Sequence, residues 1–358
     1  MNFKNILTPG SQVEEIEVQP DGKILVAGNL ATRGAVFRRN VVRLDADGSV
    51  DATFNFTAGS NIYAPTAMKL LPNGKILVGG AFDNASGQPN RKLARLNADG
   101  SLDTTFAITG ISPEFVSAIE LQPDGKILIM QANFNGGTYT TRLNADGSVE
   151  TRNGVRFYFD HEDGLEMQVT FLPNENKILL TGNFTYTVNQ TTYKGVARYN
   201  LDGTIDTTFA ANVTTTSQYY NVYAVPLAGG KILIYGSFEA VNGVVRRNIA
   251  VLNNNGSLDA SFNPRIDVNQ INTAAVQANG KIIVDTFSFA ARYSAILFRL
   301  NADGTIDNTF YSGRGLTNGG RITFSNVLKI RGDDKLLIGG RFYRYHIFPR
   351  SGLVQINL

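Results

Sequence analysis

The chain has 358 residues, a formal net charge of +3 at pH 7 and neither cysteine nor tryptophan. The lack of cysteine excludes disulfides, thiolate metal sites and cysteine nucleophiles. So small a net charge does not favour a nucleic-acid partner bound through phosphate neutralisation. No run of 18 apolar residues is present, so we expect no membrane insertion, and residues 1–10 lack the apolar core of a signal peptide.

One pattern recurs along the whole chain: an apolar strand ending, a tight turn such as Pro20-Asp21-Gly22, and a second apolar strand stopped by glycine. The period between copies is 50 to 54 residues, and a lysine opens the second strand of each copy: Lys23, Lys75, Lys126, Lys177, Lys231, Lys281 and Lys335. Units of this kind cannot bury a core alone and must stack on their neighbours. We therefore predict a single domain over residues 1–358 with a period of about 51 residues.

The first unit predicts four short strands. Residues 13–18 alternate between apolar and polar side chains, whereas residues 23–27 are almost continuously apolar, as in a strand buried on both faces. Residues 41–44 and 50–55 supply the third and fourth strands, and turns that end in glycine form the hairpins. No segment has the helical period. The pattern predicts an all-β fold, a seven-bladed β-propeller with four antiparallel strands per blade.

A pair of opposite charges supports this register. Arg43 in the third strand is expected to face Asp51 in the fourth, eight residues later, and four other units have an arginine and an acid at the same offset. The fifth unit has Val251 opposite Asp259 instead. A second interpretation, hydrogen bonding of these acids to the turn backbone, explains the pattern equally well.

The two ends of the sequence complement each other. The chain stops after a third strand at residues 353–358, and Phe3 aligns with Phe54 and Phe106 at the end of a fourth strand. We expect residues 1–8 to supply the outer strand of the last blade and to close the ring. No acid is then available opposite position 355, which is Gln355 rather than arginine. We also expect a stand-alone subunit.

Two segments carry a resemblance to a known family: LLPNGKILVGGAF at residues 70–82 and RLNADGSLDTTF at residues 95–106. With them, the chain resembles the delta-sixty-repeat β-propeller family along essentially its whole length. The resemblance implies modules of bacterial surface or secreted proteins and of phage virions, without shared catalytic residues. The chain departs from the pattern at Gln131, at residues 152–153 and at residues 174–176.

Function is expected on the loops opposite the repeated turns, because binding residues usually lie on variable loops of a rigid scaffold. Segment 341–350 is rich in arginine and aromatic residues, the types enriched in interface hot spots. The alternative is that Phe342 is a core residue of the repeat and that Arg350 only precedes a strand. The predicted partner-binding residues are Arg341, Tyr343, Arg344, Tyr345, His346 and Phe348, with Tyr158, His161, Tyr219 and Tyr220 elsewhere.

No metal or cofactor site is predicted. Residues 157–163 hold a histidine and three acids, but adjacent residues rarely converge on one ion, so an acidic loop is favoured. The runs such as residues 45–51 look like calcium loops, yet their glycine is fourth, where the hairpin needs it, and not sixth.

An enzyme is the least favoured class of function. The chain has only two histidines, His161 and His346, and no nucleophile elbow, phosphate loop or zinc signature. We predict a non-catalytic structural or protein-interaction subunit of a larger assembly, virion-associated or extracellular, with a phage virion or tail component as the preferred example. The alternative is a cell-surface or secreted module that recognises glycan or protein, and a hydrolase-type propeller comes last.

Overall fold

The computed structural model describes residues 3–56, 64–82, 84–85, 88–89, 92–132, 138–151, 162–188, 190–215, 220–266, 268–288, 294–310, 316–317, 324–332, 334–345 and 348–358. The chain divides into two compact units. Unit 1 comprises residues 1–133, 141–156 and 314–358, and unit 2 comprises residues 134–140 and 157–313. Among the described residues, no helix has the length and apolar character needed to cross a lipid bilayer.

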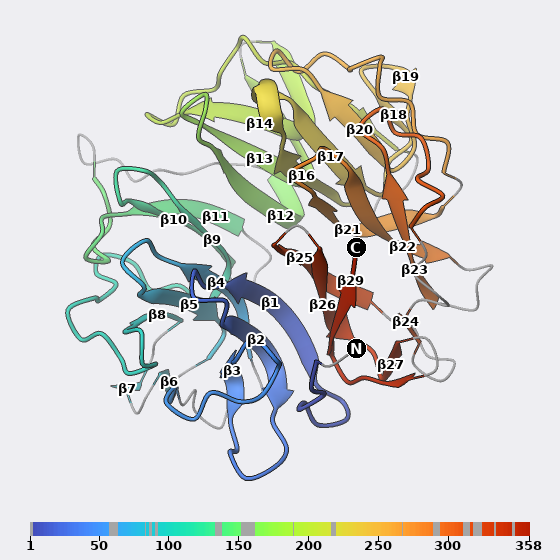
Figure 1. Cartoon of the computed structure of the whole chain (residues 1–358). Coiled ribbons are helices and arrows are strands. Elements are labelled where there is room, and N and C mark those ends of the chain that lie inside the picture. Colours follow the sequence, from blue (N-terminus) through green and yellow to red (C-terminus); the bar gives the residue numbers. More distant parts are fainter. Residues whose placement is uncertain are drawn as a thin grey trace. The chain divides into compact units, whose positions relative to one another are not determined.

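Seven antiparallel sets of three strands follow one another along the described part of the chain (Figure 1). In chain order they are β1 (Gln12–Val18), β2 (Ile24–Ala31) and β3 (Arg39–Leu44); β4 (Pro65–Leu70), β5 (Ile76–Gly80) and β8 (Leu93–Leu96); β9 (Phe115–Leu121), β10 (Ile127–Ala132) and β11 (Thr138–Leu143); β12 (Glu162–Leu172), β13 (Lys177–Val188) and β14 (Thr191–Asn200); β16 (Val222–Pro226), β17 (Ile232–Gly236) and β20 (Ile249–Leu252); β21 (Gln270–Val276), β22 (Ile282–Ser288) and β23 (Ser294–Leu300); and β25 (Phe324–Arg331), β26 (Lys335–Arg341) and β29 (Leu353–Asn357).

Two-residue strands occupy several connections. Between the second and third strands lie β6 (Asn84–Ala85) with β7 (Gln88–Pro89), β18 (Ala240–Val241) with β19 (Val244–Val245), and β27 (Arg344–Tyr345) with β28 (Phe348–Pro349). Strands β15 (Val213–Thr214) and β24 (Leu316–Thr317) lie in links between consecutive sets, and they pair with β18 and β27. One 3-10 turn, η1 (Ala228–Gly230), is the only helical element in the described ranges. The prediction of an all-β chain is confirmed for these ranges.

The predicted fourth strand is reduced to a single bridge. Val50 pairs with Leu44, and the Asp51 backbone N–H still donates to the Arg43 carbonyl at 2.9 Å. The Asp51 carboxylate then accepts the Thr53 backbone N–H at 2.9 Å, which bends the chain away from the sheet. Equivalent single bridges occur after five other third strands. Four strands per blade are therefore not confirmed, because the Asp-X-Thr/Ser sequence forms a turn.

Within each unit the hydrophobic cores lie between consecutive sheets. The middle strands β2 and β5 are buried over most of their length, as their continuous apolar sequence predicts. Leu25 and Ala27 of the first sheet pack in one cluster with Met68, Ile76 and Val78 of the second. Each sheet thus depends on its neighbour for burial, which is the behaviour expected of stacked repeats.

The first strand of most sheets carries a β-bulge that the sequence did not indicate. In five sheets the register shifts at the position nine residues before the repeat lysine: Glu14, Thr66, Ser117, Asn272 and Asn326. A bulge leaves one residue unpaired in the hydrogen-bond ladder between two strands. Asn326 is such a residue, and its side-chain amide donates to the Val13 carbonyl of the neighbouring sheet at 2.9 Å.

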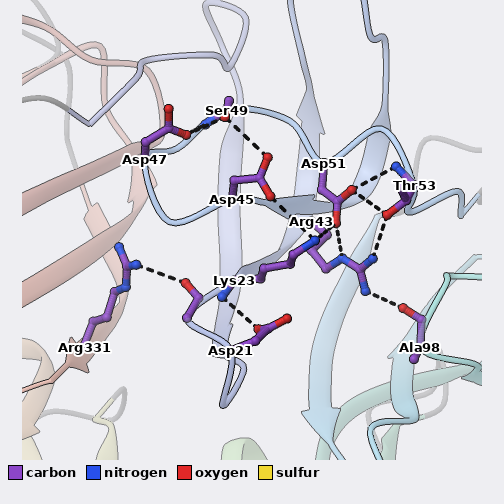
Figure 2. A network of polar contacts seen from close by, with 11 residues as sticks. Asp21, Lys23, Arg43, Asp45, Asp47, Ser49, Asp51, Thr53, Ala98 and Arg331 are labelled. Atoms are coloured by element: carbon purple, nitrogen blue, oxygen red, sulfur yellow. Dashed lines mark hydrogen bonds and ion pairs between the residues drawn. The ribbon is translucent and has the colours of Figure 1, made fainter.

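The repeated arginine and aspartate form the predicted pair together with the repeat lysine. Figure 2 shows the first copy, in which Asp51 Oδ2 accepts from Arg43 Nε at 2.8 Å and from Lys23 Nζ at 2.6 Å. The same guanidinium lies 4.9 Å from the Phe54 ring centroid and donates to the Ala98 carbonyl in the turn of the next sheet. Because Asp51 also accepts from the Thr53 backbone, both interpretations of this acid are confirmed.

Within unit 1 the last sheet lies beside the first. Strand β25 neighbours β1, β1 neighbours β4, and β4 neighbours β9 (Figure 1). Phe3 and Leu7 share one buried cluster with β1 to β3 and with Leu337 and Leu353 of the last sheet. The Lys4 backbone N–H donates to the Asp47 carbonyl at 2.9 Å, as the residue after Phe54 does to the next sheet. The predicted alignment of Phe3 with Phe54 is therefore confirmed.

Candidate interaction surface

The richest predicted segment forms an exposed hairpin in unit 1. Strands β27 and β28 pair Arg344 with Pro349 and Tyr345 with Phe348, and β27 also pairs with β24. The side chains of Tyr343 and Phe348 are 40% and 50% exposed, and Arg344 is exposed as well. Such large aromatic groups are more often buried, so this hairpin presents an unusual amount of aromatic surface to solvent.

A second connection continues this surface. The loop between β2 and β3 exposes Phe37 to 53%, and the Arg39 guanidinium lies 5.2 Å from the Phe37 ring centroid. The N-terminal segment joins the two connections, because Asn5 donates from Nδ2 to the Pro349 carbonyl at 3.1 Å and accepts from Arg33 Nε at 3.1 Å through its own carbonyl. We name this area the arginine-aromatic surface: Arg33, Phe37, Arg39, Arg341, Tyr343, Arg344 and Phe348.

The arginine-aromatic surface is strongly cationic. Segments 29–40 and 341–352 together hold six arginines and no acidic residue, which leaves the rest of the chain at a net charge of −3. Two of these arginines donate to backbone carbonyls: Arg38 Nε donates to the Phe54 carbonyl at 2.8 Å, and Arg33 donates to the Asn5 carbonyl. Neither segment contains a carboxylate that would offset this charge.

The other predicted site residues lie in different environments. Arg341 is exposed, whereas Tyr345, within the same hairpin, is only 6% exposed. Tyr220 in unit 2 is buried, and its hydroxyl lies 3.4 Å from the Phe184 carbonyl. Phe342 is buried like Phe82 of the second repeat, which confirms the core interpretation for that residue. The predicted residues Tyr158, His161, Tyr219 and His346 lie outside the described residues.

Sequence reasoning missed a charged cluster on the first strands of unit 1. Lys329 Nζ pairs with Glu17 at 2.6 Å, and Lys69 Nζ pairs with Glu120 at 2.7 Å, each across neighbouring sheets. Burial, with the charge of Glu17 next in importance, raises the pKa of Glu15 to about 8. The sequence does contain a signal for this cluster. At the position six residues before the repeat lysine, consecutive repeats of unit 1 alternate between lysine and glutamate: Lys329, Glu17, Lys69 and Glu120.

This cluster has the chemistry of a structural network. The carboxylates of Glu17 and Glu120 are each held by a lysine, and Glu14 accepts from Asn326 at 2.8 Å. Among the described residues, no group of three histidine or acidic side chains is arranged to hold a metal ion. At the equivalent positions unit 2 has the apolar residues Phe171, Val225 and Ala275.

Comparison with known proteins identifies the class of protein. Five segments match the model of a β-propeller domain of unknown function, DUF5122: residues 19–54, 71–106, 176–209, 230–262 and 277–310. These matches and the repeated sheets show a β-propeller repeat protein. No curated protein matched the sequence.

Several solved propellers share the fold at low identity. A catalytically inactive virginiamycin B lyase from Staphylococcus aureus, solved with quinupristin, has a TM-score of 0.60 at 10% identity, covering 99% of this chain and 96% of its own. The WD40 β-propeller domain of Doa1 has a TM-score of 0.55 at 9% identity, covering 99% and 96%. YCF48 bound to a D1 peptide has a TM-score of 0.53 at 11% identity, covering 99% and 95%. At such identities the likeness shows the fold alone.

Proposed function

We propose that the chain is a non-catalytic β-propeller that binds other protein subunits of a larger assembly through the arginine-aromatic surface. The observation that carries this proposal is the exposure of Phe37, Tyr343 and Phe348 in two segments that contain six arginines and no acidic residue. Aromatic and arginine side chains dominate interface hot spots because they combine large contact area with directional hydrogen bonding. YCF48, a similar propeller, was solved with a bound peptide, which supports peptide binding as a use of this fold.

We also propose that the seven sets of strands are the blades of one propeller, in the delta-sixty-repeat family, whose last blade is completed by residues 1–8. The contacts of Phe3 and Asn5 with the last sheet support this closure. A closed ring protects its sheet edges and presents loops on a rigid frame. A virion or tail component, or another virion-associated or extracellular assembly, is the context we prefer.

A second candidate is a cell-surface or secreted module that binds glycan. Exposed Tyr343 and Phe348 favour it, because aromatic rings are suitable platforms for stacking on sugars. The two candidates differ in the partner that they capture and in the role of charge. A glycan without acidic groups depends on the rings, whereas an acidic protein surface depends on the arginines as well.

The test is quantitative affinity purification from the source material with three versions of the full chain. Wild type should retain one or more proteins in fixed ratio, and the variant Arg341→Glu/Arg344→Glu/Phe348→Ala should lose them. The matched control Val245→Ala/Arg247→Glu alters exposed residues in the equivalent connection of the fifth repeat and should retain them. Equal retention by all three versions, or capture of glycan alone, would contradict the proposal.

A further inference from the structure

The fifth repeat lacks an arginine that five other repeats carry at the same position: Arg43, Arg95, Arg142, Arg198 and Arg299. Arg43, Arg95 and Arg198 each bind the acid eight residues later and also donate to a carbonyl in the turn of the next sheet. Those carbonyls belong to Ala98, Ala145 and Asn254. Arg299 binds Asp307 likewise. In the fifth repeat the position is Val251, although Asp259 stands opposite it with a backbone hydrogen bond of 2.8 Å.

A cleft of about 540 Å³ lies at the place that this arginine would fill. Its walls come from the fifth and sixth sheets of unit 2, and they include Val251, Asp259 and the turn residue Ala302. Ala302 is the counterpart of Ala98 and Ala145, which accept from arginine in other repeats. The remaining walls are largely apolar, with Val225, Val276 and Ile282 among them.

The acid in this cleft keeps only part of its usual set of donors. Asp259 accepts from Lys231 Nζ at 2.6 Å and from the Ser261 hydroxyl at 2.7 Å, and hydrogen bonds from these two residues lower its pKa to about 2. Its side chain is 12% exposed, against 4–5% for the four aspartates that bind an arginine as well. In the part of the chain that the structure describes, no donor is found for the Ala302 carbonyl.

The last repeat shows that a guanidinium from another position can serve the same acceptor. Gln355 replaces the repeat arginine there, and Arg331 from β25 donates to the Ala46 carbonyl at 2.8 Å and to Gln355 Oε1 at 2.9 Å. Ala46 is the first-repeat counterpart of Ala302. The chain therefore supplies a substitute guanidinium in the last repeat, whereas the cleft in the fifth repeat stays open.

We propose that this cleft binds the guanidinium group of an arginine side chain from a partner protein. Asp259 and the Ala302 carbonyl would accept its N–H groups, as the equivalent atoms do for arginines within the chain. A planar guanidinium reaches both acceptors at once, which a single ammonium does not, and its methylene stem packs on the apolar walls. Lys231 does not prevent this, because Asp51 and Asp103 each bind a lysine and an arginine together. The site is independent of the arginine-aromatic surface.

The experiment measures binding of N-acetyl-arginine amide to the full chain by NMR or calorimetry, in the millimolar range expected for so small a ligand. The matched probe N-acetyl-citrulline amide has the same shape without the charge and should bind at least tenfold more weakly. The variant Val251→Arg, which restores the residue of the other repeats, should raise the melting temperature and reduce binding at least tenfold. Asp259→Asn should also reduce binding.

Several outcomes decide the proposal. Unchanged binding by Val251→Arg, equal binding of citrulline, or no saturable binding would overturn it. Free L-arginine binding tenfold more tightly than the amide would overturn the assignment to a partner protein and indicate the free amino acid as the ligand. An arginine-containing pentapeptide that binds at least as tightly as the amide, and loses affinity with Val251→Arg, would support the partner assignment.

Discussion

Asn5 fastens the N-terminal segment to the last sheet of the chain: its Nδ2 donates to the Pro349 carbonyl at 3.1 Å, and its Oδ1 accepts from the Ser351 backbone N–H at 3.4 Å. Asn5 and Pro349 are separated by 344 positions in sequence. The contact is accompanied by Phe3, which is 6% exposed in a cluster shared by the first and last sheets.

Deleting residues 1–8 should therefore lower the melting temperature sharply, because it removes the buried side chains of Phe3 and Leu7 from the cluster shared by the first and last sheets, together with the Asn5 hydrogen bonds. Phe3→Ala alone should cost about 3 kcal/mol of unfolding free energy. Lys4→Ala is the matched control: its exposed ion pair with Asp47 should contribute less than about 1 kcal/mol. Thermal denaturation checks all three, and an unchanged curve for the deletion would contradict closure.

The buried acid of the second repeat should be far more sensitive than the acid in the adjacent turn. Asp103 accepts from Lys75, Arg95 and Thr105, so Asp103→Asn should destabilise by about 2–4 kcal/mol. The Asp99 carboxylate is exposed and accepts from the Ser101 backbone N–H and hydroxyl within the turn.

Asp99→Asn should therefore change stability by less than about 1 kcal/mol, since the fifth repeat already uses Asn255 for the same hydrogen bonds. Urea unfolding of both variants gives the comparison. Similar costs for the two substitutions would mean that the lysine and arginine contribute little.

Two glycines test how closely consecutive repeats approach. Gly74 and Gly100 both have positive φ angles, of 80° and 87°. A Cβ at Gly74 would meet nothing within 4 Å, whereas at Gly100 it would lie 2.9 Å from the Asn55 backbone nitrogen. Gly74→Ala should cost about 1 kcal/mol from backbone strain alone. Gly100→Ala should cost clearly more in the same unfolding experiment, and equal costs would count against the close approach.

The stability contributed by Glu15 should depend on pH. Its pKa is raised by burial, and secondarily by Glu17, from an ordinary 4.5 to about 8 in the folded chain. Because the pKa of Glu15 is higher in the folded chain than in the unfolded chain, the folded state is not penalised at a pH below 4.5, where Glu15 is protonated in both states. As the pH rises from 4.5 through 8, the unfolded chain loses this proton first and the folded state loses stability. Lys329 and Lys69 limit the shift but do not reverse it.

Glu15→Gln should therefore match wild type at pH 4 and exceed its stability by about 1–3 kcal/mol at pH 9. Unfolding by urea across this range measures the difference. A difference that is the same at both pH values would show that Glu15 does not titrate in this window.

Much of the fold was predictable because the same pattern of strands and turns recurs in each repeat. The turns at Gly22 and Gly48, the apolar middle strands and the pair of Arg43 with Asp51 all follow from local chemistry. The fourth strand was predicted wrongly as a strand of several residues, because the hydrogen bond from the Thr53 backbone to Asp51 ends the pairing after one bridge. The bulge at Glu14 was not predicted from the alternation of apolar and polar residues in this strand, because one extra residue reverses that alternation.

The sites were less predictable because they depend on neighbours that are distant in sequence. Val251 was visible as an exception to the arginine pattern, yet the cleft beside it requires the turn at Ala302, a full repeat later. Arg344 and Phe348 were found by composition, whereas Phe37 joins them only through the folded N-terminal segment. The pairing of Lys329 with Glu17 likewise needs the last sheet beside the first.

Amide hydrogen exchange of the full chain, alone and with the protein that co-purifies with it, tests the central claim most directly. We predict slower exchange on binding in segments 33–39 and 341–350, where the arginine-aromatic surface lies, and no change in the turns around Gly74 and Gly125. Protection should weaken as salt is raised, because exposed charges are screened. Protection confined to those turns or to residues 240–247, with segments 33–39 and 341–350 unchanged, would contradict the account.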